Sequence, residues 1–348
     1  MIKPTRLKKN DTIALVSLSS NNIAEPEFSF RFDLIKNRLE KLGLKYVFSK
    51  NALLPRSELN AHPELIAEDL VACLQDKNIK GIIAINGGRN AIDMVPHLMK
   101  VKGIDDIIRN NPKILLGFSD TTIQHLFFYN RGVQTYYGQN IVCDICEQEK
   151  NMFSYSLRAF KGFFKLKRVK IKPSKFWYHE RSAYDISQLN IKRIKSKNIS
   201  FEVFGINSFL EGELLGGCIE RLNSLLTEDK YQACKLFPSL EVWQDKIVFL
   251  ESCDFSLEFN KFKEYLINLD NFGVFKVAKA IIYGRNPNEQ CSIDCKNELL
   301  KYANQYSIPL VYNANIGHSS PRAILPYGAK VRIDNKGIIT LLENFVSE

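Results

Sequence analysis

The sequence feature that most restricts the fold is a regular alternation of short apolar runs with amphipathic segments. In the first half of the chain, runs rich in Ile, Leu and Val alternate with segments whose apolar residues recur at helical spacing. Parallel strands buried on both faces have this continuous apolar character, and helices provide the crossovers between them. The alternation therefore predicts an α/β protein with a parallel sheet covered by helices on both faces. The predicted strands are 11–17, 44–48, 81–85 and 113–117, and the predicted helices are 28–42, 63–74, 91–99, 121–131 and 154–164.

The pattern changes after residue 164. Residues 169–200 are basic and irregular, which is typical of a linker or a surface loop region. Because 348 residues exceed what one core usually supports, we predict two domains, 1–164 and 201–348, joined by a linker and substrate loop at 165–200. In the second domain we predict strands at 201–204, 211–215, 246–250, 278–283 and 308–312, helices at 218–226, 255–269 and 293–305, and a hairpin formed by 330–334 and 338–342.

Composition excludes few functions. The net charge of +10 would suit a nucleic-acid partner, but no nucleic-acid-binding signature accompanies the lysines, so a lysine-rich surface is favoured and no nucleic-acid partner is predicted. Eight cysteines in a chain of this length fit reduced thiols, and the spacings Cys143-x-x-Cys146 and Cys291-x-x-x-Cys295 lack the histidine pair that would favour zinc. No apolar run has the length of a signal-peptide core or a membrane span. We predict a cytoplasmic protein without a membrane partner.

The most informative stretch is Gly117-Phe118-Ser119-Asp120, which follows a predicted buried strand and precedes a predicted helix. A serine on such a sharp turn presents its hydroxyl above the sheet edge, and the next backbone N–H lies where negative charge is stabilised. An acyl-transfer enzyme needs both features. Simple helix capping by the same residues is the alternative.

Three other stretches offer matching chemistry. Gly87-Gly88 follows a buried strand and allows either a close backbone approach to a ligand or a tight turn. Glu251 ends another strand, where a carboxylate pairs with an imidazole or caps a helix. His318 is the one histidine of five that stands in a loop after a strand and beside a glycine. A serine nucleophile requires such a base, and the base requires an orienting carboxylate.

Taken together, the pattern resembles the LD-carboxypeptidase family, including its microcin C self-immunity peptidase branch. The similar stretches follow the family's order across nearly the whole chain. They are GG-x-N at Gly87–Asn90, NPKILLGFSDTT at Asn111–Thr122, TYYGQN at Thr135–Asn140, Gly216–Gly217, IVFLES at Ile247–Ser252 and GHSSPRAILPYGAKVRID at Gly317–Asp334.

The resemblance implies that Ser119 is the nucleophile, His318 the general base and Glu251 its orienting carboxylate, with an oxyanion hole formed by the backbone N–H groups of Gly88 and Asp120. It also implies an N-terminal Rossmann-like domain, a smaller C-terminal β-rich α/β domain, no metal or other cofactor, and a homodimer. The expected substrate contacts are Arg89, Asn90 and Trp177, although a solvated arginine and a tryptophan in the core or at a dimer contact are alternatives.

We therefore predict a serine carboxypeptidase that hydrolyses an amide bond near a free C-terminus through an acyl-enzyme, with a cell-wall muropeptide containing an L–D bond as its substrate. A peptidyl-nucleotide of the microcin C type is the alternative within this chemistry. A non-catalytic ligand-binding paralogue is the alternative outside it. Two departures from the family pattern bear on substrate preference: Cys218 stands where Asn is usual, and Asn315 stands where an acidic residue is common.

Overall fold

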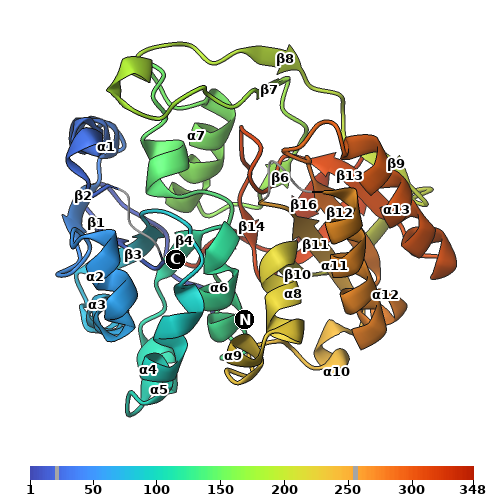
Figure 1. Ribbon diagram of the computed structural model, residues 1–348, viewed down its shortest axis with the longest axis horizontal. Helices are drawn as coiled ribbons and strands as arrows, with labels where there is room; N and C mark the ends of the chain where they lie inside the picture. The colour runs from blue at the N-terminus through green and yellow to red at the C-terminus, as the bar shows by residue number, and fades with distance from the viewer. Residues whose placement is uncertain (20–22, 254–257) are drawn as a thin grey trace.

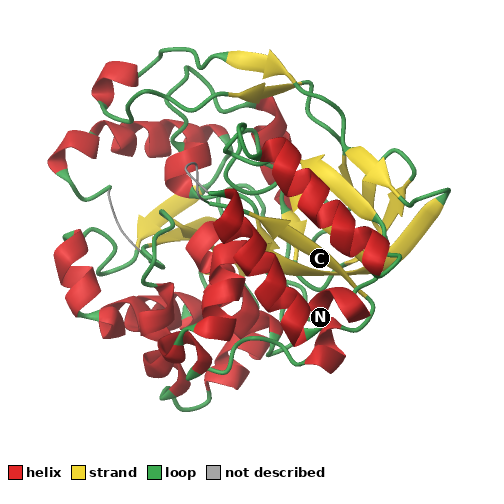
Figure 2. Cartoon of the chain, turned by 45° about the vertical axis from the view of Figure 1, so that its right-hand side comes forward, coloured by secondary structure: helices red, strands yellow, loops and turns green. Residues whose placement is uncertain are grey.

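The computed structural model describes residues 1–19, 23–253 and 258–348. Figure 1 shows two α/β halves side by side, with the N-terminal half in blue to green and the C-terminal half in yellow to red. Helices and strands occur throughout both halves (Figure 2). The predicted α/β class is confirmed.

The N-terminal half is built on a six-stranded sheet with the order β14-β5-β4-β3-β1-β2. The strands from β2 to β5 pair in parallel, and β14 pairs antiparallel with β5 at one edge. β14 comes from far along the chain, so the C-terminal half contributes a strand to the N-terminal sheet. The strands are β1 (Thr12–Val16), β2 (Lys45–Phe48), β3 (Ile79–Ala84), β4 (Ile114–Gly117), β5 (Tyr136–Tyr137) and β14 (Leu325–Pro326).

The helices predicted for this half are observed with different ends, but two short helices, at 56–61 and 104–110, were not predicted. The predicted helix 91–99 is divided into a 3-10 turn (Ala91–Met94) and α4, because Pro96 has no N–H to continue a helix that began at Ala91. The helices are α1 (Phe30–Lys41), α2 (Arg56–Ala61), α3 (Pro63–Gln75), α4 (Val95–Met99), α5 (Ile104–Asn110), α6 (Thr122–Tyr129) and α7 (Ser154–Phe160).

The C-terminal half is built on a mixed eight-stranded sheet with the order β6-β16-β15-β10-β11-β12-β13-β9. Its centre, from β10 to β13, is parallel, and antiparallel strands flank the centre on both sides. The predicted hairpin is confirmed as β15 and β16. The strands are β6 (Lys170–Ile171), β9 (Glu202–Phe204), β10 (Phe209–Cys218), β11 (Lys246–Glu251), β12 (Ala280–Gly284), β13 (Leu310–Ala314), β15 (Lys330–Asp334) and β16 (Ile339–Leu341).

The start of the predicted helix 255–269 lies outside the described residues, and the described helix α11 continues to Phe272. The helices of this half are α8 (Ile219–Thr227), α9 (Asp229–Gln232), α10 (Leu240–Trp243), α11 (Phe259–Phe272), α12 (Val274–Val277) and α13 (Ser292–Gln305). No helix within the described ranges is long and apolar enough to cross a membrane.

Residues 172–198, which we call the arm, run across the top of both halves in Figure 1. The sequence predicted irregular structure here, but the arm contains an antiparallel pair of short strands, β7 (Phe176–Tyr178) and β8 (Lys195–Lys197). Strands of three residues are too short for the alternating pattern that identifies a strand in a sequence.

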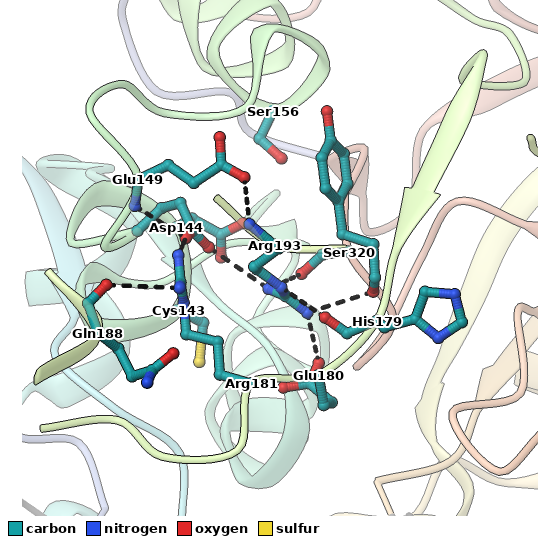
Figure 3. Close-up of polar contacts among 12 residues, drawn as sticks. Cys143, Asp144, Glu149, Ser156, His179, Glu180, Arg181, Gln188, Arg193 and Ser320 are labelled. Atoms are coloured by element: carbon teal, nitrogen blue, oxygen red, sulfur yellow. Dashed lines mark hydrogen bonds and ion pairs between the residues drawn. The ribbon is translucent and has the colours of Figure 1, made fainter. Parts of the chain in front are cut away.

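Buried charges hold the arm in place (Figure 3). Arg193 donates hydrogen bonds to the carbonyl oxygen of His179 at 2.7 Å and to Ser320 Oγ at 3.1 Å. Arg181 and Arg193 both form ion pairs with the buried Glu147, at 2.5 and 3.4 Å. Removing one partner of such a network would leave a buried charge uncompensated. The arm is therefore fixed against the segment that contains Ser320.

Candidate active site

Ser119 occupies a strained turn between β4 and α6. Its φ of 67° lies in the left-handed region, which a residue with a side chain adopts only when the surroundings impose it. The side chains of Thr121 and Thr122 close the turn by donating to the carbonyl oxygens of Phe118 and Ser119, at 2.9 and 2.7 Å. A Cβ atom at Gly117 would lie 2.6 Å from Thr121 Oγ1, so this turn requires glycine two residues before the serine.

The structure brings Glu251 and His318 together. Glu251 is the last residue of β11, and His318 lies in the loop after β13, where its Nδ1 is 2.7 Å from Glu251 Oε2. Glu251 is only 1% exposed. A Cβ atom at Gly317, whose φ is +83°, would lie 2.3 Å from Glu251 Oε2, so only glycine allows this close approach.

The surroundings keep Glu251 ionised. Burial by itself would raise the pKa of this carboxyl, but the charge of His318 and the hydrogen bonds from His318 and Tyr137 outweigh it. The pKa of Glu251 therefore lies below its ordinary value. In the neutral form of the imidazole, a carboxylate beside Nδ1 favours the tautomer with the N–H on that nitrogen, so that Nε2 is the acceptor.

Tyr137, at the end of β5, connects the serine turn to this pair. Its hydroxyl accepts a hydrogen bond from the Ser119 N–H at 3.0 Å and donates to Glu251 Oε1. The rings of Phe118 and His318 also pack edge to face, with centroids 4.9 Å apart. The three residues predicted to act together are therefore linked through one buried hydroxyl. Tyr137 lies in a family-like stretch of the sequence, but the sequence predicted no role for it.

Arg322 holds the backbone of the histidine loop. Its guanidinium donates to the carbonyl oxygens of Gly317 and His318, at 2.6 and 2.5 Å, and lies 3.3 Å from the Asp144 carboxylate. Both charged side chains are buried. Neither residue has a role predicted from the sequence, although Arg322 lies in a family-like stretch, because their partners are distant in sequence.

The Gly87-Gly88 loop lies against the serine. A Cβ atom at Gly87 would be 3.3 Å from Ser119 Cβ and 3.4 Å from its Oγ. The buried Asp120 side chain holds this loop, because its Oδ2 accepts from Ser19 Oγ at 2.5 Å and from the Ala91 N–H at 2.9 Å. The two predicted oxyanion donors, the N–H groups of Gly88 and Asp120, thus belong to segments that flank the serine side chain.

The predicted substrate contacts differ in their surroundings. Arg89 is exposed, and Asn90 is half-buried with its amide hydrogen-bonded to Asn60. Trp177 lies in the arm, where the Arg285 guanidinium is 3.8 Å from its ring centroid. The carbonyl oxygen of Arg285 accepts from Ser319 Oγ at 3.2 Å, so Trp177 is connected to the loop that carries the histidine.

A cavity of about 110 Å³ adjoins His318. Arg322, Ser320 and four residues of the arm are part of its lining, and the four are Glu180, Arg181, Tyr184 and Arg193. The arm therefore forms one wall of the space beside the imidazole.

The two departures from the family pattern have clear structural settings. Asn315 accepts a hydrogen bond from the Ser174 N–H at 2.8 Å through its Oδ1, and so connects the histidine loop to the arm. Cys218 belongs to the one group in the described part of the chain that brings three possible metal-ligand atoms within 4.8 Å of one another, with Glu220 and Cys253. The cysteine pairs 143/146 and 291/295, which the sequence disfavoured as zinc ligands, are not part of it.

A serine on a strained strand-to-helix turn, connected through Tyr137 to a carboxylate–imidazole pair on an α/β scaffold, is an arrangement typical of serine hydrolases. Residues 13–138 match the family model described as the LD-carboxypeptidase N-terminal domain, and residues 211–333 match the one described as the LD-carboxypeptidase C-terminal domain. The chain belongs to the LD-carboxypeptidase family and is a serine carboxypeptidase.

Individual relatives agree with this assignment. The crystal structure of an MccF-like protein from Streptococcus pneumoniae in complex with AMP is 35% identical and has a TM-score of 0.91, covering 96% of this chain and 99% of that one. A Bacillus subtilis protein named as a probable murein peptide carboxypeptidase is 25% identical over 353 residues, covering 99% of this chain and 96% of its own. The Microcin C7 self-immunity protein MccF of Escherichia coli is 24% identical over 292 residues, covering 81% and 79%. The predicted family resemblance is confirmed, including its likeness to the MccF branch.

Proposed function

We propose that Ser119, His318 and Glu251 are the catalytic triad of this carboxypeptidase. The observation that carries the proposal is the 2.7 Å contact between His318 and Glu251, with the Ser119 N–H joined to the same carboxylate through Tyr137. Ser119 Oγ attacks the carbonyl carbon of the scissile amide while His318 Nε2 takes the hydroxyl proton. The imidazolium then gives that proton to the leaving amine, and an acyl-enzyme remains. Water, activated by the same imidazole, releases the acid and regenerates the serine.

We assign the oxyanion hole to the backbone N–H groups of Gly88 and Asp120. The Ser119 N–H donates to Tyr137, so it is already committed. Asp120 follows the serine at the start of a helical segment, where backbone N–H groups favour negative charge. Gly88 follows Gly87, which lies against the serine side chain. Donors on both sides of Ser119 suit a developing oxyanion between them.

For the substrate we propose a short peptide with a free carboxyl terminus, in first place a cell-wall muropeptide with an L–D bond. The relative named as a murein peptide carboxypeptidase supports this, because its likeness extends over 99% of this chain. The cavity beside His318 is lined by arginines that already pair with Glu147, Glu180 and Asp144, so the proposal of a peptide substrate rests on this relative and not on the charge of the cavity.

A peptidyl-nucleotide is the second candidate. The relative with 35% identity was solved with AMP, and Trp177, whose ring packs against Arg285 and His179 next to the histidine loop, is the aromatic side chain proposed to contact a base. We propose Arg89, Asn90 and Trp177 as contacts in either case.

Two experiments test these proposals. A fluorophosphonate should label the wild-type chain and leave Ser119→Ala unlabelled. Equal labelling of both would show that Ser119 is not the nucleophile.

Chromatographic analysis of a muropeptide tetrapeptide and a peptidyl-adenylate, each incubated with the wild-type chain, identifies the substrate class. Cleavage of neither, together with tight binding of one, would favour a ligand-binding paralogue.

A further inference from the structure

The described part of the chain contains a group of thiols and a carboxylate that the catalytic proposal does not use. Cys218 ends β10, Glu220 lies in the first turn of α8, and Cys253 follows β11 by two residues. Parallel strand pairing places Cys218 opposite Glu251. The group therefore lies at the edge of the active site.

The geometry points to a metal. One ligand atom from each of the three side chains lies within 4.8 Å of the others. Two thiolates bound tetrahedrally to Zn²⁺ at about 2.3 Å would be roughly 3.8 Å apart, so the cluster is compact enough for a single ion. We propose that Cys218, Glu220 and Cys253 bind one thiophilic divalent cation of the Zn²⁺ class, through two sulfurs and one carboxylate oxygen, with the fourth position taken by water.

The carboxylate is already oriented for this role. Glu220 Oε1 accepts from Ser252 Oγ and, at 3.1 Å, from the Cys253 N–H, whereas Oε2 accepts from the Cys218 thiol at 2.9 Å. The proton on that thiol therefore lies where a cation bound to both groups would replace it. Hydrogen bonds of this kind to the other oxygen are what orient a ligating carboxylate in a metal site.

The protons released and the charges brought together when the cation binds can be accounted for. Burial, the neighbouring thiol and nearby carboxylates raise the pKa of Cys218, so it is a neutral thiol before the cation binds. Binding releases the protons of both thiols to solvent, and the two thiolates and Glu220 then face one dication. Arg221, which pairs with Asp120 at 3.7 Å, is near enough for its charge to act on both cysteines and to offset part of the remaining negative charge. Cys253 is only half-buried, which gives the ion a route of entry.

The cluster also has a direct connection to the catalytic turn. The Cys218 N–H donates to Thr122 Oγ1 at 3.1 Å, and that hydroxyl donates to the carbonyl oxygen of Ser119 at 2.7 Å. A cation that pulls Cys218 toward Cys253 would therefore act on the turn that positions Ser119. Occupancy is expected to inhibit the enzyme.

The test uses Cd²⁺, whose thiolate complexes absorb in the ultraviolet. The full chain, reduced and freed of metal by a chelator, is titrated with Cd²⁺ and then with competing Zn²⁺. We expect one equivalent to bind with the absorption of two thiolates and to be displaced by Zn²⁺. Cys253→Ser should lose that equivalent, and Cys291→Ser, an equally half-buried thiol elsewhere, should keep it. Glu220→Gln should retain the absorption but bind more weakly.

Three results would overturn the proposal: no Cd²⁺ binding, unchanged binding by Cys253→Ser, or an equal loss in Cys291→Ser. Mass spectrometry of the air-exposed chain provides a separate check. If a disulfide joins Cys218 and Cys253, and the reduced chain still does not bind Cd²⁺, the two cysteines form a redox pair and the metal proposal is wrong. Absorption and stoichiometry do not depend on peptidase activity, so a failure here is distinguishable from a failure of the catalytic proposal. Loss of turnover with Zn²⁺ in wild type, but not in Cys253→Ser, would then establish the inhibitory role.

Discussion

The hydroxyl of Tyr137 offers a sharp test of how the site is assembled. Tyr137→Phe keeps the buried ring and removes two hydrogen bonds, one from the Ser119 N–H and one to Glu251 Oε1. A buried N–H without a partner costs about 1–3 kcal/mol, and a hydrogen bond to a charged group contributes about 1.5–3 kcal/mol. Because the substitution has both effects, we expect the unfolding free energy to fall by about 2.5–6 kcal/mol.

Turnover should fall as well, because the same hydroxyl positions both the serine turn and the carboxylate. If the transition state loses the whole charged hydrogen bond of about 1.5–3 kcal/mol, kcat drops by roughly 10- to 150-fold. The pH profile gives an independent readout. The hydrogen bond from Tyr137 lowers the pKa of Glu251, so its removal should move the acidic limb of kcat toward higher pH.

Tyr136→Phe is the matched control. Tyr136 is equally buried, and its hydroxyl also makes two hydrogen bonds, from Gln134 at 3.0 Å and to the carbonyl oxygen of Phe345 at 2.8 Å. Urea unfolding should show a loss of stability in both variants, and steady-state kinetics should show a loss of turnover only in Tyr137→Phe. Equal kcat values in the two variants, with unshifted pH profiles, would refute the positioning role of Tyr137.

Three further predictions concern the carboxylate, its glycine neighbour and a buried histidine. Glu251→Gln should fold and lose roughly 10³–10⁴-fold in kcat, the scale for an orienting carboxylate; wild-type kcat in that variant would contradict the assigned role. Gly317→Ala, whose Cβ would lie 2.3 Å from Glu251, should lose turnover, whereas Gly103→Ala has a similar φ but nothing within 4 Å and should keep it. Burial lowers the pKa of His125 from 6.5 to about 3. Between these pH values the imidazole is protonated only in the unfolded chain, so the free energy of unfolding decreases as the pH is lowered. From pH 6.5 to 5.0 this residue should account for about 2 kcal/mol of lost unfolding free energy, a slope that urea titrations of His125→Gln should lack.

The local sequence pattern predicted the parallel strands other than β5, and it pointed to the residue types of the site. The run before Ser119 is buried on both faces of a sheet, so it is apolar throughout and easy to identify. Gly117 and Gly317 are required by contacts with Thr121 and Glu251, which is why glycine flanks both functional residues. The family-like stretches then indicated which serine, glutamate and histidine belong together.

The sequence did not predict what depends on contacts between distant segments. Tyr137 is one of two consecutive buried tyrosines, and only the meeting of β5 with β11 distinguishes it from Tyr136. Arg193 stands in a loop rich in lysine and arginine, so nothing in the sequence indicated that its side chain is buried and donates a hydrogen bond to Ser320. The short strands of the arm likewise depend on partners that a local pattern does not reveal.

The route of the chain explains why the imidazole can be held so firmly on a loop. The segment with His318 begins at β13 in the C-terminal sheet and ends at β14, which pairs with β5 in the N-terminal sheet. β5 also carries Tyr137, whose hydroxyl bonds to Glu251 at the end of β11. Each half thus contributes a strand or a side chain to the other at the site itself. Separating the halves would break the carboxylate contact, the β14 pairing and the arm's attachment to Ser320 together, so the integrity of the site and the association of the two sheets are one structural property.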